Sequence, residues 1–369
     1  MKFGKTAFAL GLILCLAFFA GCISSTEESQ GETIKVGVIA PLSGPSVTSG
    51  EPFMRGMNIA LDEINNAGGV NGMKIELLVE DSKSTPQGGV DACNNLINLK
   101  EPDAIVPVLS SISVAVAPLA KENRIPMVAT LALSANVTSE DNDWMFRYFT
   151  LPEAQTMPLV QIAEAMGFKK VAVLYLTDEL GVSSYEVFRQ RFSGEVVGES
   201  FIGSAGDFRT ELTKLKAQNP DALYVVGYET HSVNAITQAK ELGLNATIFA
   251  TSIAAVPTAR KALKDAGIEF YTAVPVTYNE DDEKVKAFKD KFLGLYGKEA
   301  DHHSCIGYDT LYLIAKVVGS SGHSRDGIRE GLSELDGFEG LDGSTDIEGK
   351  DFLIAYEPAL VRDGTVYYL

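Results

Sequence analysis

Short apolar runs alternate with amphipathic segments along the chain, and this alternation restricts the possible folds more than any other feature. Residues 34–40 (IKVGVIA) form one such run. After it, apolar residues repeat at the spacing of one helix face: Phe53, Met57, Ala60, Leu61 and Ile64. Further strands are expected at 74–80, 104–108 and 126–129, with helices at 86–100 and 111–123. Strands separated by helices pair in parallel, so a doubly wound α/β sheet is predicted.

The same alternation starts again after Phe146 and Arg147. Strands are expected at 170–176, 196–201, 222–226, 247–250 and 270–274, with helices at 152–166, 184–192, 208–218, 231–242 and 257–266. Consecutive helices then follow at 282–296, 304–320 and 326–335, before short strands near 352–356 and 365–368. No linker rich in Pro, Gly and Ser separates the two rounds. We therefore predict an α/β protein of two closely coupled, doubly wound parallel-sheet lobes.

Residues 1–21 have the pattern of a signal peptide. Lys2 and Lys5 precede an almost wholly apolar stretch, 7–20, which is too short to span a bilayer as a stable anchor. It ends in Phe-Ala-Gly-Cys22, and small residues directly before a cysteine resemble the lipobox of lipoproteins. We expect Cys22 to be the lipidated mature N-terminus and 22–32 to be a tether, with plain secretion or an uncleaved anchor as alternatives. The protein would then be extracytoplasmic, on the outer face of the cytoplasmic membrane.

Charge and motif content argue against several classes of function. With 49 acidic and 31 basic residues the formal charge is −18, which disfavours nucleic acid as a partner because phosphates need a basic face. The 4 histidines form no His-Glu-x-x-His motif. The sequence also has no phosphate-binding loop, dinucleotide fingerprint or Gly-x-Ser-x-Gly elbow. We therefore predict no enzymatic activity, no metal and no cofactor.

A candidate ligand site follows the strand predicted at 104–108. Ligands of open α/β sheets bind beyond the carboxyl ends of the strands. Here that end continues through Ser110 and Ser111 into a helix, so hydroxyls and free backbone N–H groups meet at a helix N-terminus. Such a group suits a carboxylate or another polar head group. The alternative is that one serine only caps the helix.

Several short motifs together carry a family resemblance that none carries alone. They are GVIAPLSG (37–44), INNAGGVNG (64–72), Glu80-Asp81, Phe146-Arg147, Asp207-Phe208, LTKLK (212–216), Asn219-Pro-Asp221 and Gly307-Tyr-Asp309. In this order and spacing the chain resembles the type I periplasmic binding proteins of ABC importers. Within that group it is most similar to the leucine/isoleucine/valine-binding family, over Thr33–Leu369.

This resemblance implies how the chain is divided and what it does. One lobe would be 33–150 plus 278–350 and the other 151–277 plus 351–369, with three strands forming the hinge. A small-molecule ligand that contacts both lobes would stabilise closure, which an ABC permease and its ATPases would recognise. The protein would be a monomeric solute-binding protein of an ABC importer. A ligand sensor of the same fold that reports to a signalling partner is the alternative.

In the first lobe, the positions that contact the ligand in the family can be matched to individual residues of this chain. Ser110 matches the serine that binds the ligand's carboxylate, with Ser111 beside it. Leu131 and Leu133 stand where the next loop of the family offers small residues and a threonine. Ser49 stands in place of the aromatic residue of the first loop. The resemblance therefore implies a pocket that is more apolar around Ser110 than is usual in the family.

In the second lobe the match departs further from the family. Leu180 replaces a tyrosine, and the acid that pairs with the ligand's ammonium aligns with His231 or, after a slip, with Glu229. An α-amino acid needs an acceptor for its ammonium, because a buried unpaired charge is costly. Branched-chain amino acids, aliphatic or aromatic carboxylates and small amides all remain possible ligands.

Overall fold

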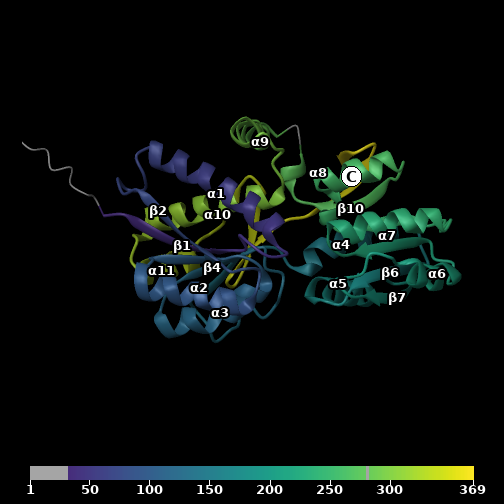
Figure 1. Ribbon diagram of the computed structural model, residues 1–369, viewed down its shortest axis with the longest axis horizontal. Coiled ribbons are helices and arrows are strands. Elements are labelled where there is room, and N and C mark those ends of the chain that lie inside the picture. The colour runs from purple at the N-terminus through teal and green to yellow at the C-terminus, as the bar shows by residue number, and fades with distance from the viewer. Residues whose placement is uncertain (1–31, 280–281) are drawn as a thin grey trace, which may run out of the picture.

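The structure is a computed structural model that describes residues 32–279 and 282–369. The predicted signal peptide, Cys22 and all of the predicted tether except Glu32 lie outside these residues. Within the described part of the chain, no helix combines the length and apolar character needed to cross a membrane. The described residues form two α/β lobes, each built on one sheet, which lie next to each other along the long axis of the molecule (Figure 1).

The first lobe begins with the predicted alternation of strands and helices. Its N-terminal elements are β1 (Ile34–Ala40), α1 (Val47–Asn66), β2 (Ile75–Asp81), α2 (Pro86–Asn95), the π-helix η1 (Leu96–Lys100), β3 (Ala104–Pro107), α3 (Ser110–Asn123), β4 (Met127–Thr130) and β5 (Met145–Phe149). The sheet order is β11-β12-β13-β5-β4-β3-β1-β2. Strands from β13 to β2 run parallel, whereas β12 and β11 extend the sheet antiparallel at one edge.

The second lobe repeats this construction. Its elements are α4 (Pro152–Ala165), β6 (Lys170–Leu176), α5 (Glu179–Arg191), β7 (Glu195–Phe201), α6 (Arg209–Ala217), β8 (Ala222–Val226), α7 (Glu229–Glu241), β9 (Thr247–Ala250), the 3-10 helix η2 (Ser252–Ala255), α8 (Pro257–Asp265) and β10 (Phe270–Val274). The sheet order is β15-β14-β10-β9-β8-β6-β7, with β14 and β15 antiparallel. The predicted α/β class with two doubly wound lobes is confirmed, but both sheets are mixed rather than purely parallel.

The C-terminal part of the chain contributes to both lobes. The 3-10 helix η3 (Val276–Tyr278) leads to α9 (Glu283–Tyr296), α10 (His302–Ser321), α11 (Arg325–Glu334), β11 (Glu339–Gly340), β12 (Gly343–Glu348) and β13 (Asp351–Ile354) in the first lobe. Strands β14 (Glu357–Arg362) and β15 (Thr365–Tyr368) then complete the second sheet. Helix α10 thus lies beside α1 although the two are far apart in sequence (Figure 1).

Both faces of each sheet are covered, as a doubly wound fold requires. In β1, Val36 and Val38 belong to the apolar cluster on the side of α1 and α10, whereas Ile39 belongs to the cluster on the side of α2 and α3. Because successive side chains of a strand point to opposite faces, a strand covered on both sides reads as one continuous apolar run. This explains why the short apolar runs were good predictors of strands.

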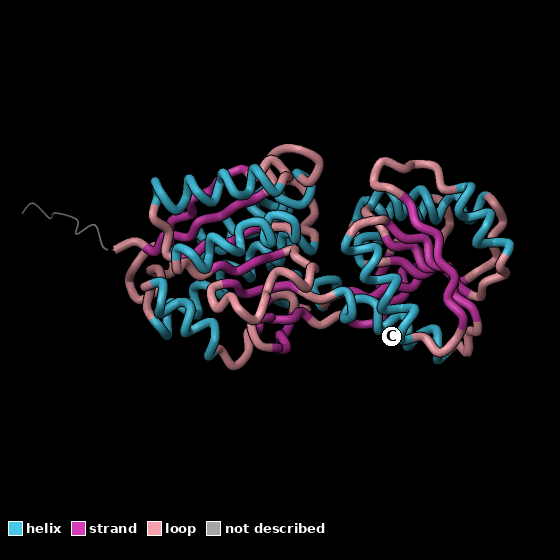
Figure 2. The backbone as a smooth tube through the Cα atoms, turned by 90° about the horizontal axis from the view of Figure 1, so that it is seen from below, coloured by secondary structure: helices cyan, strands magenta, loops and turns pink. Residues whose placement is uncertain are grey.

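The described chain crosses between the lobes at three places: from β5 to α4, from β10 through η3 to α9, and from β13 to β14 (Figure 2). The third crossing lies later than the predicted boundary at residue 350. Asp351, Phe352 and Leu353 of β13 pair with β5 in the first sheet. We therefore propose that the lobe boundary follows Ile354 rather than Lys350.

Candidate functional site

The carboxyl ends of the parallel strands in the two lobes approach the hinge from opposite sides. In the first lobe β5 is parallel to β4, and its carboxyl end leads directly into the crossing to α4. In the second lobe β10 is parallel to β9, and its carboxyl end leads into the crossing through η3. The loops that follow the parallel strands of the two sheets therefore face each other, and such edges are where open α/β sheets bind ligands.

The loop between β3 and α3 has an uncommon backbone conformation. Leu109 adopts φ 82° and ψ 147°, a region that is nearly exclusive to glycine and costs on the order of 1–3 kcal/mol. This conformation starts α3 at Ser110. The backbone N–H groups of Ser110, Ser111 and Ile112 then have no acceptor among the described residues, as expected for a first helical turn. The turn presents hydrogen-bond donors at the edge that faces the second lobe.

Ser110 also connects this turn to the loop after β4. Its Oγ accepts hydrogen bonds from the N–H groups of Leu133, at 2.9 Å, and Ser134, at 3.3 Å. Leu131 begins that loop with a positive φ of 50° and is buried in the core of the first lobe. Leu133 packs on the same core and also against the apolar cluster of the second lobe that contains Leu180. The structure therefore places these four predicted residues at the two facing edges.

The other two predicted residues of the first lobe, Ser49 and Ser111, lie at the same edge. Ser49 is in the first turn of α1, which follows β1, and it is half-buried. Ser111 is the second residue of α3 and is exposed. Ser110, by contrast, bonds to two backbone groups of a neighbouring loop. The site therefore contains one serine anchored to a neighbouring loop, a second of similar burial, Ser49, and an exposed one, Ser111.

In the second lobe, an acid and a phenol that the sequence analysis did not single out are linked at the same kind of edge. Asp178 follows β6 and caps α5, because its Oδ1 accepts from the N–H of Gly181 at 3.0 Å. Its Oδ2 accepts from the hydroxyl of Tyr228, which follows β8, at 2.9 Å. Tyr228 is 52% exposed. Although half of the side chain is exposed, neighbouring protein partly desolvates the phenol. This desolvation and the charge of Asp178 raise the pKa of Tyr228, so the phenol remains a donor.

The rule that ligands bind beyond strand ends could have identified this pair. Both Asp178 and Tyr228 come within two residues of strands that were predicted correctly, 170–176 and 222–226. The comparison with family motifs drew attention to neighbouring positions instead. Only the tertiary contact between the two side chains shows that they act as a unit.

His231 and Glu229 are both engaged within the second lobe. His231 is buried, its Nδ1 accepts from the N–H of Tyr228 at 3.3 Å, and its Nε2 lies 3.0 Å from the carbonyl oxygen of Gly203. These partners assign the ring proton to Nε2. The Glu229 carboxylate accepts from the hydroxyl of Thr258. The role as ammonium partner that the resemblance gave to His231 or Glu229 stays a prediction, and in this conformation these contacts of both residues are internal to the lobe.

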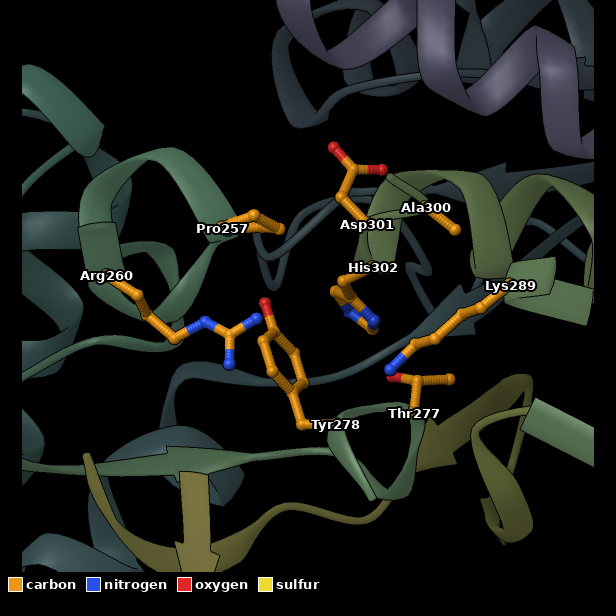
Figure 3. Close-up of a pocket in the computed structure, with 8 residues that line it drawn as sticks. All are labelled: Pro257, Arg260, Thr277, Tyr278, Lys289, Ala300, Asp301 and His302. Carbon is orange, nitrogen blue, oxygen red and sulfur yellow. The ribbon is translucent and has the colours of Figure 1, made fainter. Parts of the chain in front are cut away.

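A small pocket lies at the hinge itself. It is lined by Pro257, Arg260, Thr277, Tyr278, Lys289, Ala300, Asp301 and His302 (Figure 3). The Asp301 carboxylate points away from Tyr278 and caps α10, accepting from the N–H of Ser304 at 3.0 Å. Among the described residues no group of three or more His, Cys, Asp or Glu side chains could hold a metal ion. The expected absence of metals and cofactors stays a prediction.

Two hinged α/β lobes with polar loops on their facing edges define a class of two-lobed binding protein. The chain belongs to the periplasmic binding protein family, which matches residues 33–357. This confirms the resemblance drawn from the motifs. The chain is 25% identical to the leucine-, isoleucine-, valine-, threonine-, and alanine-binding protein of Pseudomonas aeruginosa over 341 residues, covering 89% of this chain and 91% of that protein. It is 26% identical to an amino acid binding protein of the same species over 298 residues, covering 78% and 79%.

Solved structures give the same result. A leucine binding protein from Thermotoga maritima has a TM-score of 0.80 and 26% identity, covering 91% of this chain and 98% of that one. A branched-chain amino acid transporter substrate binding protein from Streptococcus pneumoniae, in complex with isoleucine, has a TM-score of 0.78 and 25% identity, with the same coverage of 91% and 98%. A solute binding protein from Rhodopseudomonas palustris, in complex with 3,4-dihydroxy benzoic acid, has a TM-score of 0.79 at 21% identity, covering 91% and 96%. That last likeness concerns the fold alone.

Proposed function

We propose that the protein is an extracytoplasmic, lipid-anchored solute-binding protein of an ABC importer. It captures a small polar or amphipathic ligand between its lobes by closing the hinge. The facing strand edges, with polar groups beside apolar side chains on both lobes, are the observation that carries this proposal. Relatives named for binding amino acids support the class of ligand. The lipobox-like residues before Cys22 support the anchor.

The polar groups of the two edges differ in kind: the first lobe offers hydrogen-bond donors and the second offers an acidic acceptor. The first lobe offers the Ser110 hydroxyl and the free N–H groups at the start of α3, which suit a carboxylate. The second lobe offers the carboxylate of Asp178, already paired with Tyr228, as an acceptor for an ammonium or amide N–H. Leu133, in contact with both lobes, provides apolar surface between them. We infer a ligand with a carboxylate or carbonyl at one end and an aliphatic side chain, such as a branched-chain amino acid or a related carboxylate or amide.

A matched panel of small molecules tests the proposal by thermal unfolding of the purified protein. The panel contains leucine, 4-methylpentanoate, which lacks the amine, leucinamide, which lacks the carboxylate, and benzoate. A ligand present at 100 times its Kd adds roughly 2.7 kcal/mol to the free energy of unfolding and raises Tm. We expect leucine or 4-methylpentanoate to stabilise the protein more than leucinamide does, because the free N–H groups at the start of α3 bind a charged carboxylate more strongly than a neutral amide. If no member of a panel widened to all amino acids and small carboxylates stabilises the protein, the proposal is wrong.

Three variants, one of them a control, then test the residues. We expect Ser110→Ala to weaken binding of the stabilising carboxylate by about 10- to 100-fold, the range for one hydrogen bond to a charged group. Ser111→Ala, one residue further along the same helix, is the matched control and should change affinity less. Asp178→Asn should weaken the binding of leucine more than the binding of 4-methylpentanoate, because only leucine has an ammonium group. Equal losses for the two serine variants would remove Ser110 from the site.

A further inference from the structure

A buried polar cluster at the hinge contains two carboxyl groups, those of Asp309 and Asp342, and the backbone N–H of Asp342 donates to the Asp309 carboxylate. Asp309 of α10 and Asp342 of the turn between β11 and β12 are 1% and 2% exposed. Asp309 accepts hydrogen bonds from the Tyr148 hydroxyl at 2.9 Å and from the N–H groups of Leu341 and Asp342 at 2.8 and 3.1 Å. Gly340 permits this approach, because a Cβ there would lie 2.3 Å from the Asp309 carboxylate. The turn is therefore wrapped closely around the Asp309 side chain.

Asp342 continues the cluster into the segments that connect the lobes. Its Oδ1 accepts from the Thr277 hydroxyl in η3 at 2.8 Å and lies 3.3 Å from Nδ1 of His302. His302 Nε2 lies 3.1 Å from the hydroxyl of Tyr356, in the link between β13 and β14. His302 Nδ1 forms no hydrogen bond with a described residue, so its contact with Asp342 is one of proximity only. Oδ2 of Asp342 is buried without a hydrogen-bond partner among the described residues.

The cluster thus draws one residue from the neighbourhood of each crossing. Tyr148 lies in β5, which leads into the first crossing, Thr277 lies in the second, and Tyr356 lies in the third. The bonds from Tyr148 and Thr277 reach the carboxyl pair directly, whereas Tyr356 bonds to His302, whose Nδ1 lies 3.3 Å from Asp342 Oδ1. A change in the charge of the pair therefore acts on all three connections at once.

The surroundings determine how the pair titrates. Burial and the charge of Asp342 raise the pKa of Asp309 to about 7, and the three donors offset this only in part. The other titratable or charged groups that act on this cluster from α8, α9, α10, η3, β14 and β15 are Arg260, Lys289, Asp301, Cys305, Tyr278, Glu357 and Tyr368. Burial raises the pKa values of the Cys305 thiol and of the Tyr278 and Tyr368 phenols, so these groups are neutral near pH 7.

We propose that Asp309 and Asp342 form a proton-binding site that couples the rigidity of the hinge to pH. With one proton the pair carries a single buried charge, and the Thr277 hydroxyl donates a hydrogen bond to Asp342. Loss of that proton leaves two buried carboxylates together, and local opening of the hinge to water relieves them. This inference goes beyond the proposed function and holds whether or not a ligand is bound.

The direction of the effect follows from linkage. The pKa of Asp309 in the closed cluster is higher than the value of about 4 in an unfolded chain, so the assembled hinge binds the proton more tightly than the opened hinge does. The stability that this proton provides is complete below about pH 4 and is lost as pH rises toward about 7. For one proton, the equilibrium constant for local opening can rise by up to about tenfold per pH unit in this window.

Hydrogen exchange of the purified protein without ligand tests this. Exchange is followed by mass spectrometry from pH 5 to pH 7, corrected for the intrinsic rates, in peptides that contain residues 274–279, 339–343 and 354–358. We expect the opening constant of these peptides to rise by about 10- to 100-fold in the wild type. A peptide containing β8 in the second lobe, remote from the cluster, should show no such rise.

Two substitutions make the test specific. Asp342→Asn keeps the oxygen that accepts from Thr277 and places an amide where Oδ2 has no partner, so we expect the pH dependence to disappear. Asp346→Asn removes an exposed carboxylate on β12 and should behave as the wild type. A pH slope that persists in Asp342→Asn, or a wild-type hinge with no slope beyond that of β8, would overturn the proposal. If Asp342→Asn does not fold, the wild-type protein alone tests the proposal: hinge peptides whose opening constant rises with pH no more than that of β8 would overturn it.

Discussion

His231 serves the fold in this structure through contacts that its sequence position does not reveal. Its two ring nitrogens satisfy a backbone N–H of Tyr228 and a backbone carbonyl of Gly203, 28 residues away. Ser110 differs, because its Oγ also bonds to backbone groups but it begins a helix whose N–H groups have no acceptor in the described chain. We therefore expect different effects when His231 and Ser110 are substituted.

We expect His231→Ala to lower the free energy of unfolding by about 2 kcal/mol, because a buried ring is removed and two backbone groups lose their hydrogen-bond partner. The Kd of whichever ligand the thermal panel identifies should change less than it does in Ser110→Ala. Urea unfolding and a binding titration measure the two effects. His323→Ala, which alters a more exposed histidine, is the control for stability. A large loss of affinity at unchanged stability would instead place His231 in contact with the ligand.

Helices α1 and α10 pack with their backbones in close contact. A Cβ on Gly56 would lie 1.8 Å from the carbonyl oxygen of Ser304, and one on Gly307 would lie 2.0 Å from that of Phe53. The absence of side chains at these positions lets a helix from the C-terminal part of the chain close the core of the first lobe. The same helix carries His302 and Asp309, so this packing also positions the hinge cluster.

We expect Gly56→Ala to destabilise the protein by about 1–3 kcal/mol, the usual range for overpacking, because backbone must move to admit the methyl group. Gly294→Ala is the matched control, since Gly294 also lies in a helix, α9, and a Cβ there would meet no neighbouring atom within 4 Å. That substitution should be neutral or stabilising by up to about 1 kcal/mol. Denaturant unfolding of both variants measures the difference, and equal effects would contradict close packing of α1 on α10.

At the scale of the whole molecule, the arrangement of the two sheets around three crossings allows the lobes to move as units. Closure requires a ligand that contacts both edges, because a ligand bound equally well by both conformations shifts no equilibrium. Leu133 already contacts the clusters of both lobes. It lies where the two edges would meet as the hinge closes.

Small-angle X-ray scattering tests this closure. We expect the radius of gyration to fall when the stabilising ligand is added at saturation. Ser110→Ala should need about 10 to 100 times more ligand for the same change, because the lost hydrogen bond belongs to the closed form. An unchanged radius of gyration at a ligand concentration that raises Tm would show that binding does not require closure.

Local pattern predicted the strands that are buried on both faces. The bounds of β1, β6, β8, β9 and β10 coincide with those expected from the sequence, and so do those of the more exposed β15. Strand β5 was missed because Arg147 interrupts its apolar run. Arg147 is nevertheless buried, since its Nε lies 3.0 Å from Asp351 Oδ1, a partner 204 residues away. Strands β11 and β12 were missed because they have no apolar run of their own. Strand β14 was missed because its apolar run, 359–361, is short and follows a proline.

The sequence by itself determined the alternating α/β lobes and the family, because periodic burial and ordered motifs are properties of neighbouring residues. It also placed Ser110 at a strand end. Only the tertiary structure decided that the Tyr228 hydroxyl donates to Asp178 and that the Asp342 N–H donates to Asp309. These pairs lie 50 and 33 residues apart in sequence. Local periodicity specifies which face of an element is buried. Which loops of the sheets then meet depends on how the lobes and the three crossings are assembled in space.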